Sequence, residues 1–200
     1  MSVGFNDRMS LRSTLQAISS RYACIQPIYL LLRYCLMSFV IQWVENCSGA
    51  QEVIRIRTPA GQLVLYSQQG VINKADWELD DGIYPQDHEI QRQFRQYWLN
   101  TDKLINIKLL KQGSDYRQKV WAELCKIPFG ETLTYSALAR KVNSSARAVG
   151  NACRDNPYPV IIPCHRVVSV SGMGGYCGQT EGDFMTIKYK LLAYEAAHKQ

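Results

Sequence analysis

The chain has 200 residues, of which 46% are hydrophobic and 20% are charged, so it can bury a sizeable core. This composition excludes a disordered tail, a collagen-like fibre and a coiled coil. Lys and Arg together number 23 against 17 Asp and Glu, and the resulting net charge of +6 suits a polyanionic partner without requiring one.

An apolar run, Pro27–Val44, approaches the length of a membrane span. Arg33 interrupts it, and an Arg in mid-membrane costs about 2.5–3.5 kcal/mol on insertion scales. No small-residue cleavage site follows the run, which disfavours a secretory signal. We therefore expect residues 1–50 to be an extension that precedes the first domain, with an amphipathic or buried helix over 27–44 and no membrane span.

The next stretch predicts a small α/β domain. Two short runs of alternating residues within 51–67 flank a Pro59-Ala60-Gly61 turn, which is typical of a β-hairpin. Apolar residues at helical spacing then predict a helix over 86–99. These residues are Ile90, Phe94, Tyr97 and Trp98. We expect this domain, with a short β-sheet, to cover residues 51–110.

Three short helices are predicted in the second half of the chain. Apolar spacing indicates the first over 115–126, and Pro128 follows its end. Thr134 is a suitable N-cap for the second, over 135–141, and the third is expected over 145–154. The last two, joined by a tight turn, form a candidate helix-turn-helix. The outer face of its second helix is polar and basic, with Arg147, Asn151 and Arg154.

A cysteine next to a histidine follows these helices. Asn156-Pro157-Tyr158-Pro159 predicts an irregular extended segment, and Val160-Ile161-Ile162 a short buried strand. Cys164 then precedes His165 and Arg166, neighbours that can lower the pKa of a thiol toward a reactive thiolate. Adjacent residues in a strand point to opposite faces, so an inert buried cysteine is the alternative.

Residues 171–178 form a glycine-dense loop, suited to a pocket around a planar ligand. The loop lacks the strand–GxGxxG–helix context of a dinucleotide site. A last helix is expected over 186–198, with Glu195 near its end as an ordinary exposed carboxylate. Its inner face would carry Tyr189, Leu192, Ala193 and Ala196.

The seven cysteines are widely spaced and form no C-x-x-C pair, and only three histidines are present. This pattern predicts neither a zinc ribbon nor a thioredoxin-like motif, and we expect no metal site. Most of the cysteines are expected to act as small buried hydrophobes in a reducing compartment.

Taken in order, these motifs resemble the methylated-DNA–protein-cysteine methyltransferases, also called O6-alkylguanine-DNA alkyltransferases. The strong resemblance covers residues 114–196, while residues 52–100 resemble the variable N-terminal domain of the family more loosely. Residues 1–50 match no part of it. The most specific strings are Arg147-Ala-Val-Gly150, Asn156-Pro157, Pro163-Cys-His-Arg-Val-Val168, Gly175-Tyr-Cys-Gly178 and Leu191-Leu-Ala-Tyr-Glu195.

The resemblance implies a DNA-repair methyltransferase that flips O6-alkylguanine out of duplex DNA. The alkyl group would pass irreversibly, and once per molecule, to Cys164. His165 would take the thiol proton through a water, and Glu195 would hold the imidazole. Tyr135 would stabilise the leaving guanine, and Asn156 would tie the recognition helix to the active-site strand. O4-methylthymine would be a second substrate.

The resemblance also assigns the DNA and pocket contacts. Arg147 would enter the base stack and fill the space of the flipped base. Further DNA contacts would come from Tyr135, Ser136, Ala148 and Asn151. The substrate pocket would be lined by Pro159, Val167, Tyr176, Cys177 and Gly178.

The fold class that follows is α/β. A small N-terminal α/β domain with a short β-sheet would precede a mainly helical C-terminal domain over 111–200, which contains the helix-turn-helix and the active-site cysteine strand or loop. We expect no cofactor, no metal and no obligate protein partner. The protein would act as a monomer in a bacterial cytoplasm, or in the nucleus of a eukaryote.

Two departures from the family and three competing functions stand beside this interpretation. Tyr116-Arg117 replace the usual Phe-Gln, and Cys177 stands where many members have Ser, which would alter pocket polarity. An alkyltransferase-like protein that only binds lesions would lack the nucleophile. A helix-turn-helix regulator would not need the Cys-His motif, and a Cys-His hydrolase would need an oxyanion site.

Overall fold

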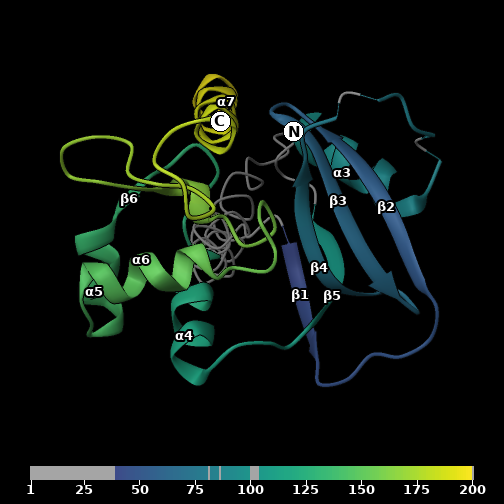
Figure 1. Ribbon diagram of the computed structural model, residues 1–200, viewed down its shortest axis with the longest axis horizontal. Helices are drawn as coiled ribbons and strands as arrows, with labels where there is room; N and C mark the ends of the chain where they lie inside the picture. The colour runs from purple at the N-terminus through teal and green to yellow at the C-terminus, as the bar shows by residue number, and fades with distance from the viewer. Residues whose placement is uncertain (1–38, 81, 86, 100–103, 200) are drawn as a thin grey trace, which may run out of the picture. The chain divides into compact units, whose positions relative to one another are not determined.

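The computed structural model describes residues 39–80, 82–85, 87–99 and 104–199. Among them the chain forms five α-helices and a five-stranded mixed sheet (Figure 1). The strands lie in the order β1-β5-β4-β3-β2, in which β2, β3 and β4 pair antiparallel and β5 pairs parallel with both β4 and β1. Their bounds are β1 Phe39–Val44, β2 Gln51–Thr58, β3 Gly61–Gln68, β4 Val71–Glu78 and β5 Ile105–Leu110.

The predicted hairpin is confirmed as β2 and β3, which pair from Gln51 opposite Gln68 to Thr58 opposite Gly61. The Thr58 hydroxyl closes the turn, since it donates to the Gly61 carbonyl and accepts from the Ala60 N–H. The second hairpin turn, between β3 and β4, has positive φ at both Gln69 and Gly70. That conformation matches the twist of the flanking strands and favours tight antiparallel pairing.

Helix α3 (Glu89–Leu99) links β4 to the parallel strand β5, as a parallel connection requires. Its predicted apolar face is confirmed, because Phe94, Tyr97 and Trp98 are buried. Phe39 of β1 packs against this face, with its ring centroid 5.3 Å from that of Phe94 and 5.0 Å from that of Tyr97. Aromatic rings from α3 and β1 thus form one end of the core.

The expected helix over 27–44 is wrong at its end, because Phe39–Val44 forms strand β1. Residues 27–38 lie outside the described residues. In β1, Phe39 is buried, Val40 is exposed and Ile41 is partly buried. This alternation is the two-residue period of a strand, and it cannot be seen in the sequence of these residues, which are all apolar. β1 therefore belongs to the sheet, although it falls within the expected extension. None of the helices among the described residues is long and apolar enough to cross a membrane.

The second half of the chain is built from short helices. Their bounds are α4 Asp115–Leu124, α5 Tyr135–Val142, α6 Ala146–Arg154 and α7 Asp183–Ala197, with a 3-10 turn η1 at Cys164–Arg166. Two short strands, β6 (Leu133–Thr134) and β7 (Val167–Val168), pair parallel. The predicted cap is present at the start of α5, where Thr134 accepts from Ala137 N–H. Ser145, expected as the first residue of the next helix, instead caps α6 and accepts from Ala148 N–H.

Two expectations for this half are corrected. Residues 160–162 are buried but form a turn rather than a strand, and Val160 has a φ of +73°, which no strand allows. The buried face of α7 does not contain Tyr189, Ala193 or Ala196. Instead it carries Met185, Ile187, Lys188, Leu191 and Glu195, because two polar residues find partners inside.

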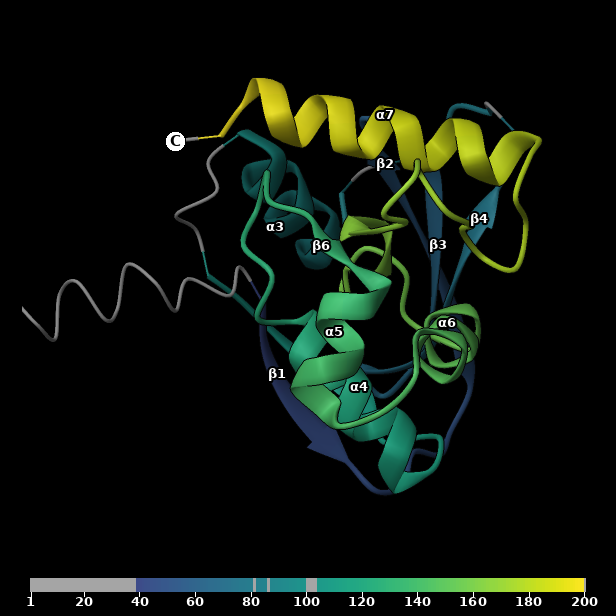
Figure 2. The same cartoon turned by 90° about the vertical axis from the view of Figure 1, so that its left-hand side faces the viewer.

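Hydrogen bonds connect the sheet to the helical half across the expected boundary near residue 110. Ala75 N–H of β4 donates to the Pro157 carbonyl at 2.8 Å, and the Tyr158 hydroxyl donates to the Leu110 carbonyl. Residues 37–200 accordingly cluster as one compact unit. Figure 2 shows α7 running along the top of the view, above α5 and α6.

Candidate active site

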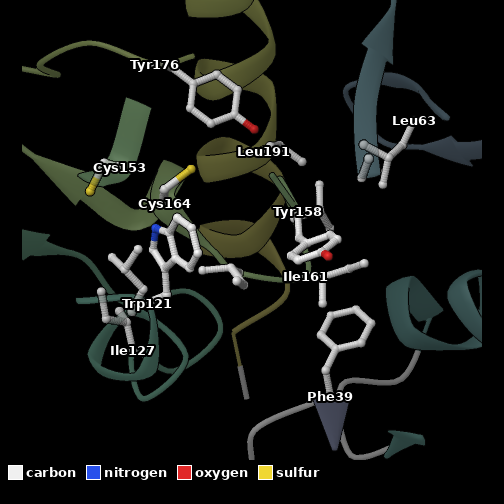
Figure 3. Packing of buried hydrophobic residues seen from close by; sticks show 14 of the residues in the cluster. Phe39, Leu63, Trp121, Ile127, Cys153, Tyr158, Ile161, Cys164, Tyr176 and Leu191 are labelled. Atoms are coloured by element: carbon white, nitrogen blue, oxygen red, sulfur yellow. The ribbon is translucent and has the colours of Figure 1, made fainter. Parts of the chain in front are cut away.

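Cys164 is held by a tight turn that Asn156 closes. The Asn156 amide donates to the Ile162 carbonyl at 2.8 Å and to the Cys164 sulfur at 3.2 Å. Its carbonyl oxygen accepts from the Tyr158 N–H at 3.0 Å, so the side chain spans the whole turn. In the view of Figure 3, Cys164 lies between the rings of Trp121 and Tyr176. Asn156, which follows the end of α6, is thus hydrogen-bonded to the cysteine and to the turn before it.

Glu195 of α7 binds the side chains of both residues that follow Cys164. One carboxylate oxygen is 2.9 Å from Nε2 of His165, and Arg166 contacts both oxygens, with distances of 2.9 and 2.8 Å. The Gly130 N–H adds a further hydrogen bond. His165 and Glu195 are completely buried, which contradicts an exposed carboxylate at position 195.

These contacts fix the charges of the cluster. Burial alone would raise the pKa of Glu195, but the charges and hydrogen bonds of His165 and Arg166 outweigh it and hold the pKa at about 2. Burial lowers the pKa of His165, so its imidazole is neutral near pH 7. With an ionised carboxylate at Nε2, the ring proton resides on Nε2 and Nδ1 is the acceptor. Nδ1 is buried and has no hydrogen-bond partner among the described residues.

Lys188 of α7 is a second buried cation beside Cys164, and it was absent from the sequence-based site. Its ammonium donates to the carbonyls of Val167, Met173 and Gly175 at 2.6 to 2.9 Å. Burial lowers its pKa to about 8. Burial also raises the pKa of the Cys164 thiol, while the Asn156 hydrogen bond and the Lys188 charge oppose that rise.

A cavity of about 420 Å³ opens beside Cys164, between the helix pair and the glycine-dense loop. Volumes of this size are common for small-molecule sites. Of the expected pocket residues, Tyr176, Cys177 and Gly178 line it, whereas Pro159 and Val167 do not. Val167 instead pairs with Leu133 in the small sheet, and Pro159 is buried in the turn before η1. Tyr135, Ser136 and Cys153 also line the cavity.

Tyr135, at the start of α5, forms part of this wall. Its hydroxyl donates to the Gly175 carbonyl at 3.1 Å. A Cβ at Gly174, where φ is +67°, would lie 2.7 Å from the Tyr135 ring, so only glycine lets the loop approach it. Burial raises the pKa of Tyr135, and its hydroxyl therefore stays protonated as a donor.

Of the expected DNA-binding residues, Tyr135 and Ser136 line the cavity, whereas those of α6 do not. Arg147 and Asn151 of α6 are exposed, while Ala148 and Ser136 are partly buried. The opposite side of α6 packs inward through Val149, Ala152 and Cys153. The structure therefore separates one group of predicted residues, buried around Cys164, from a second group that faces solvent.

The sequence-based site missed Lys188, for which a charged residue in an apolar helical run was the only available signal. It named Arg166 as a neighbour that lowers the pKa of the thiol, whereas the structure shows Arg166 as a partner of Glu195. The Arg166 guanidinium also donates to the Ile127 carbonyl and the Tyr97 hydroxyl. Among the described residues, His, Cys, Asp and Glu form no group that could hold a metal ion.

Comparisons with known proteins agree with this geometry. Residues 115–197 match a family model described as 6-O-methylguanine DNA methyltransferase, DNA binding domain. The chain is 38% identical over 112 residues to a methylated-DNA–protein-cysteine methyltransferase of Archaeoglobus fulgidus, covering 54% of this chain and 75% of that protein. It is 30% identical over 155 residues to the constitutive methylated-DNA–protein-cysteine methyltransferase of Bacillus subtilis, covering 69% of this chain and 94% of that one.

Solved structures are similar as well. The O6-methylguanine methyltransferase of Mycobacterium tuberculosis superposes with a TM-score of 0.61 at 27% identity, covering 76% of this chain and 96% of that protein. A structure of the Mycobacterium tuberculosis protein OGT in complex with DNA superposes with a TM-score of 0.58 at 29% identity, covering 72% and 93%.

Proposed function

The chain belongs to the methylated-DNA–protein-cysteine methyltransferases, and from this premise we propose that it takes one alkyl group from O6-alkylguanine in duplex DNA onto Cys164. The observation that carries the proposal is the position of Cys164 at a cavity wall, directly before a buried histidine. That histidine has one nitrogen on Glu195 and the other without a protein partner among the described residues.

In the proposed first step, the Cys164 proton passes to Nδ1 of His165 through a bridging water. Nδ1 is the acceptor because the Glu195 carboxylate holds the ring proton at Nε2. The resulting imidazolium is stabilised by the same carboxylate. The Lys188 charge and the Asn156 hydrogen bond both favour the thiolate, which burial opposes.

In the second step, the thiolate attacks the alkyl carbon and forms a carbon–sulfur bond, while the bond from that carbon to guanine O6 breaks with its electron pair on the purine. A soft, polarizable thiolate suits displacement at an alkyl carbon. The Tyr135 hydroxyl, which donates to the Gly175 carbonyl in the free protein, would turn to donate its hydrogen bond to the leaving purine and disperse its charge. The proton from the thiol finally returns to guanine, so the reaction is balanced without a cofactor.

The product is a thioether on Cys164, and hydrolysing it would require a group that can activate water at an unactivated carbon. None of the described residues of the site activates that carbon, and the thiolate is a poor leaving group toward water, so the thioether persists. Each molecule therefore reacts once. O4-methylthymine, which also carries its alkyl group on a ring oxygen, is proposed as a second substrate.

DNA would be bound by the outer face of α5 and α6. Arg147 is exposed there and would occupy the gap left by the flipped nucleotide. Ser136, Ala148 and Asn151 would contact the backbone or groove around it, and the net charge of +6 favours the polyanion. The proposed active form is a monomer, since the cavity and the helix face come from one chain.

Mass spectrometry of the protein after mixing with an O6-methylguanine duplex tests this function. We expect every active molecule to gain the mass of one CH₂ unit, mapped to the peptide that contains Cys164, and to gain no more with excess substrate. Cys164→Ser should gain none, because a hydroxyl is a poor nucleophile near pH 7. Cys47→Ser, remote from the cavity, should react like the native protein.

The competing functions predict other results. A lesion-binding protein or a helix-turn-helix regulator would bind the duplex without any gain in mass, and a hydrolase would turn over repeatedly. Methyl transfer to a residue other than Cys164 would also contradict the proposal.

A further inference from the structure

A buried hydrogen bond joins the central sheet to the wall of the cavity. The indole N–H of Trp77, near the end of β4, donates to the Tyr176 hydroxyl at 2.9 Å. Trp77 is 7% exposed and Tyr176 is 3% exposed, so water does not compete for either group. The two residues are 99 positions apart in the sequence, and nothing in the local pattern around either predicts the contact.

Tyr176 occupies a place that affects both the cavity and the histidine. Its side chain lines the cavity, and its ring meets that of His165 edge to face, with centroids 6.5 Å apart. The backbone around it turns tightly: Tyr176 and Gln179 exchange both backbone hydrogen bonds, and Cys177 and Gly178 between them have positive φ. The turn fixes the Tyr176 backbone, and the remaining freedom of the ring is restrained by the bond to Trp77.

Strand β4 can reach the site because its pairing with β5 ends partway, although its pairing with β3 continues to Glu78. It pairs with β5 only at Val71 and Ile72. The Ala75 N–H is therefore available on that edge, and it donates to the Pro157 carbonyl in the turn before Cys164. Two residues further on, Trp77 meets Tyr176. The part of β4 beyond Ile72, which no longer pairs with β5, thus contacts two segments on either side of Cys164 in the sequence. It contacts Pro157 through the Ala75 backbone and Tyr176 through the Trp77 indole.

We propose that Trp77 is a positioning residue that sets the pocket wall through the Tyr176 hydroxyl and so governs how tightly the pocket holds the substrate base. This inference rests on the proposed function, because it assumes that the cavity receives the base. Among the described residues, the Trp77 indole forms no hydrogen bond with Cys164, His165 or Glu195. Its removal should therefore weaken binding of the base more than it slows the displacement itself.

The chain offers a matched control in Trp98. This residue is 6% exposed, and its indole nitrogen is buried without a hydrogen-bond partner among the described residues. Trp98→Phe removes the same atoms from the core as Trp77→Phe, but it breaks no bond to the pocket. Any effect that arises only from the lost volume should appear in both variants.

The test measures the rate of alkylation of Cys164 over a range of concentrations of free O6-benzylguanine, which needs no DNA. We expect Trp77→Phe to raise the concentration for half-maximal rate about three- to tenfold, the usual worth of one buried hydrogen bond, with the limiting rate nearly unchanged. Tyr176→Phe should give a similar change. The double variant should be no worse than the more affected single variant, because both remove one bond.

Three outcomes would overturn the inference while leaving the function intact. They are an unchanged half-maximal concentration in Trp77→Phe, an equal change in Trp98→Phe, and effects of Trp77→Phe and Tyr176→Phe that simply multiply in the double variant. If Trp77→Phe fails to fold, Tyr176→Phe alone still decides, since an unchanged half-maximal concentration there removes the proposed route. Failure of the native protein to become alkylated would instead contradict the proposed function.

Discussion

The buried cluster around Cys164 and the outer face of α6 meet the proposed substrate in opposite ways. In the cluster, His165 and Glu195 are fully buried and Arg166 is nearly so. The Glu195 carboxylate is hydrogen-bonded to three residues, Gly130, His165 and Arg166. On the helix face, Arg147 and Asn151 are exposed, and their side chains form no hydrogen bond with the other described residues. The side chains of the cluster are held in place before substrate binds, whereas the polar side chains of the α6 face remain available to hydrogen-bond a partner.

The difference predicts how substitutions should divide. A change in the cluster leaves a buried group without its partner, so the fold and the chemistry should be lost together. A change on the helix face breaks no internal contact, so it should affect only reactions that involve duplex DNA. Substitutions in the core of the sheet form a third class, because they should lower the free energy of unfolding while the geometry around Cys164 is kept.

The largest effect is expected for Glu195→Gln. The amide cannot balance the buried charge of Arg166 or hold the proton of His165 at Nε2, so stability should fall by about 3–5 kcal/mol. Alkyl transfer should fall below detection on both free base and duplex. Denaturant unfolding and the rate of Cys164 alkylation measure the two effects.

The exposed Glu181→Gln serves as the control and should change neither quantity. Near-native transfer by a folded Glu195→Gln protein would show that the carboxylate is not needed for the proton step.

Phe39→Ala tests whether β1 is part of the structural core. Removing a ring packed between Phe94 and Tyr97 should lower the free energy of unfolding by about 3–5 kcal/mol. At temperatures where the variant is folded, the alkylation rate should be unchanged. Deleting residues 1–49 would remove all of β1 and should destabilise at least as much.

Val40→Ala is the matched control, because Val40 is the exposed neighbour on the same strand. A stable Phe39→Ala protein would mean that the domain begins after β1, as the sequence alone led us to expect.

The pH dependence of stability gives a smaller effect with a defined sign. The folded pKa of Glu195 is about 2 and its ordinary value is 4.5, so its ionisation stabilises the fold fully above pH 4.5. This contribution is lost as pH falls from 4.5 toward 2. The lowered pKa of His165 acts in the same direction, because the unfolded chain takes up that proton first as pH falls.

Urea unfolding at a series of pH values should show this loss in the native protein and a flatter curve for Glu195→Gln between pH 4.5 and 2. Parallel curves for the two proteins would contradict the assigned pKa.

Local signals in the sequence predicted the elements whose determinants are local. Thr134 caps its helix as expected, and the Pro59–Gly61 turn closes its hairpin. The sequence alone made Cys164 and His165 a candidate reactive pair, with an inert buried cysteine as the alternative. Glu195 could be named only through the family resemblance, because it lies thirty positions from His165 and reaches it through the fold. The roles assigned to these residues stay predictions.

Long-range contacts explain what the sequence could not predict. β1 was hidden because an apolar run fits a helix and a strand equally well, and only its pairing with β5 decides. The inner face of α7 was misassigned because Lys188 and Glu195 are polar, and a hydropathy pattern places polar residues outside. Their buried partners are carbonyls, an imidazole and a guanidinium from distant segments.

The most direct test of the division between the two regions compares Arg147→Ala with Tyr135→Phe on two substrates. The ratio of second-order rate constants for methylated duplex and free O6-benzylguanine should fall about ten- to a thousandfold in Arg147→Ala, since only the duplex has a stack to open. Tyr135→Phe should slow both reactions, because both release a purine. Arg95→Ala, at an exposed position of α3, controls for lost charge. Equal slowing of both substrates by Arg147→Ala would contradict the account.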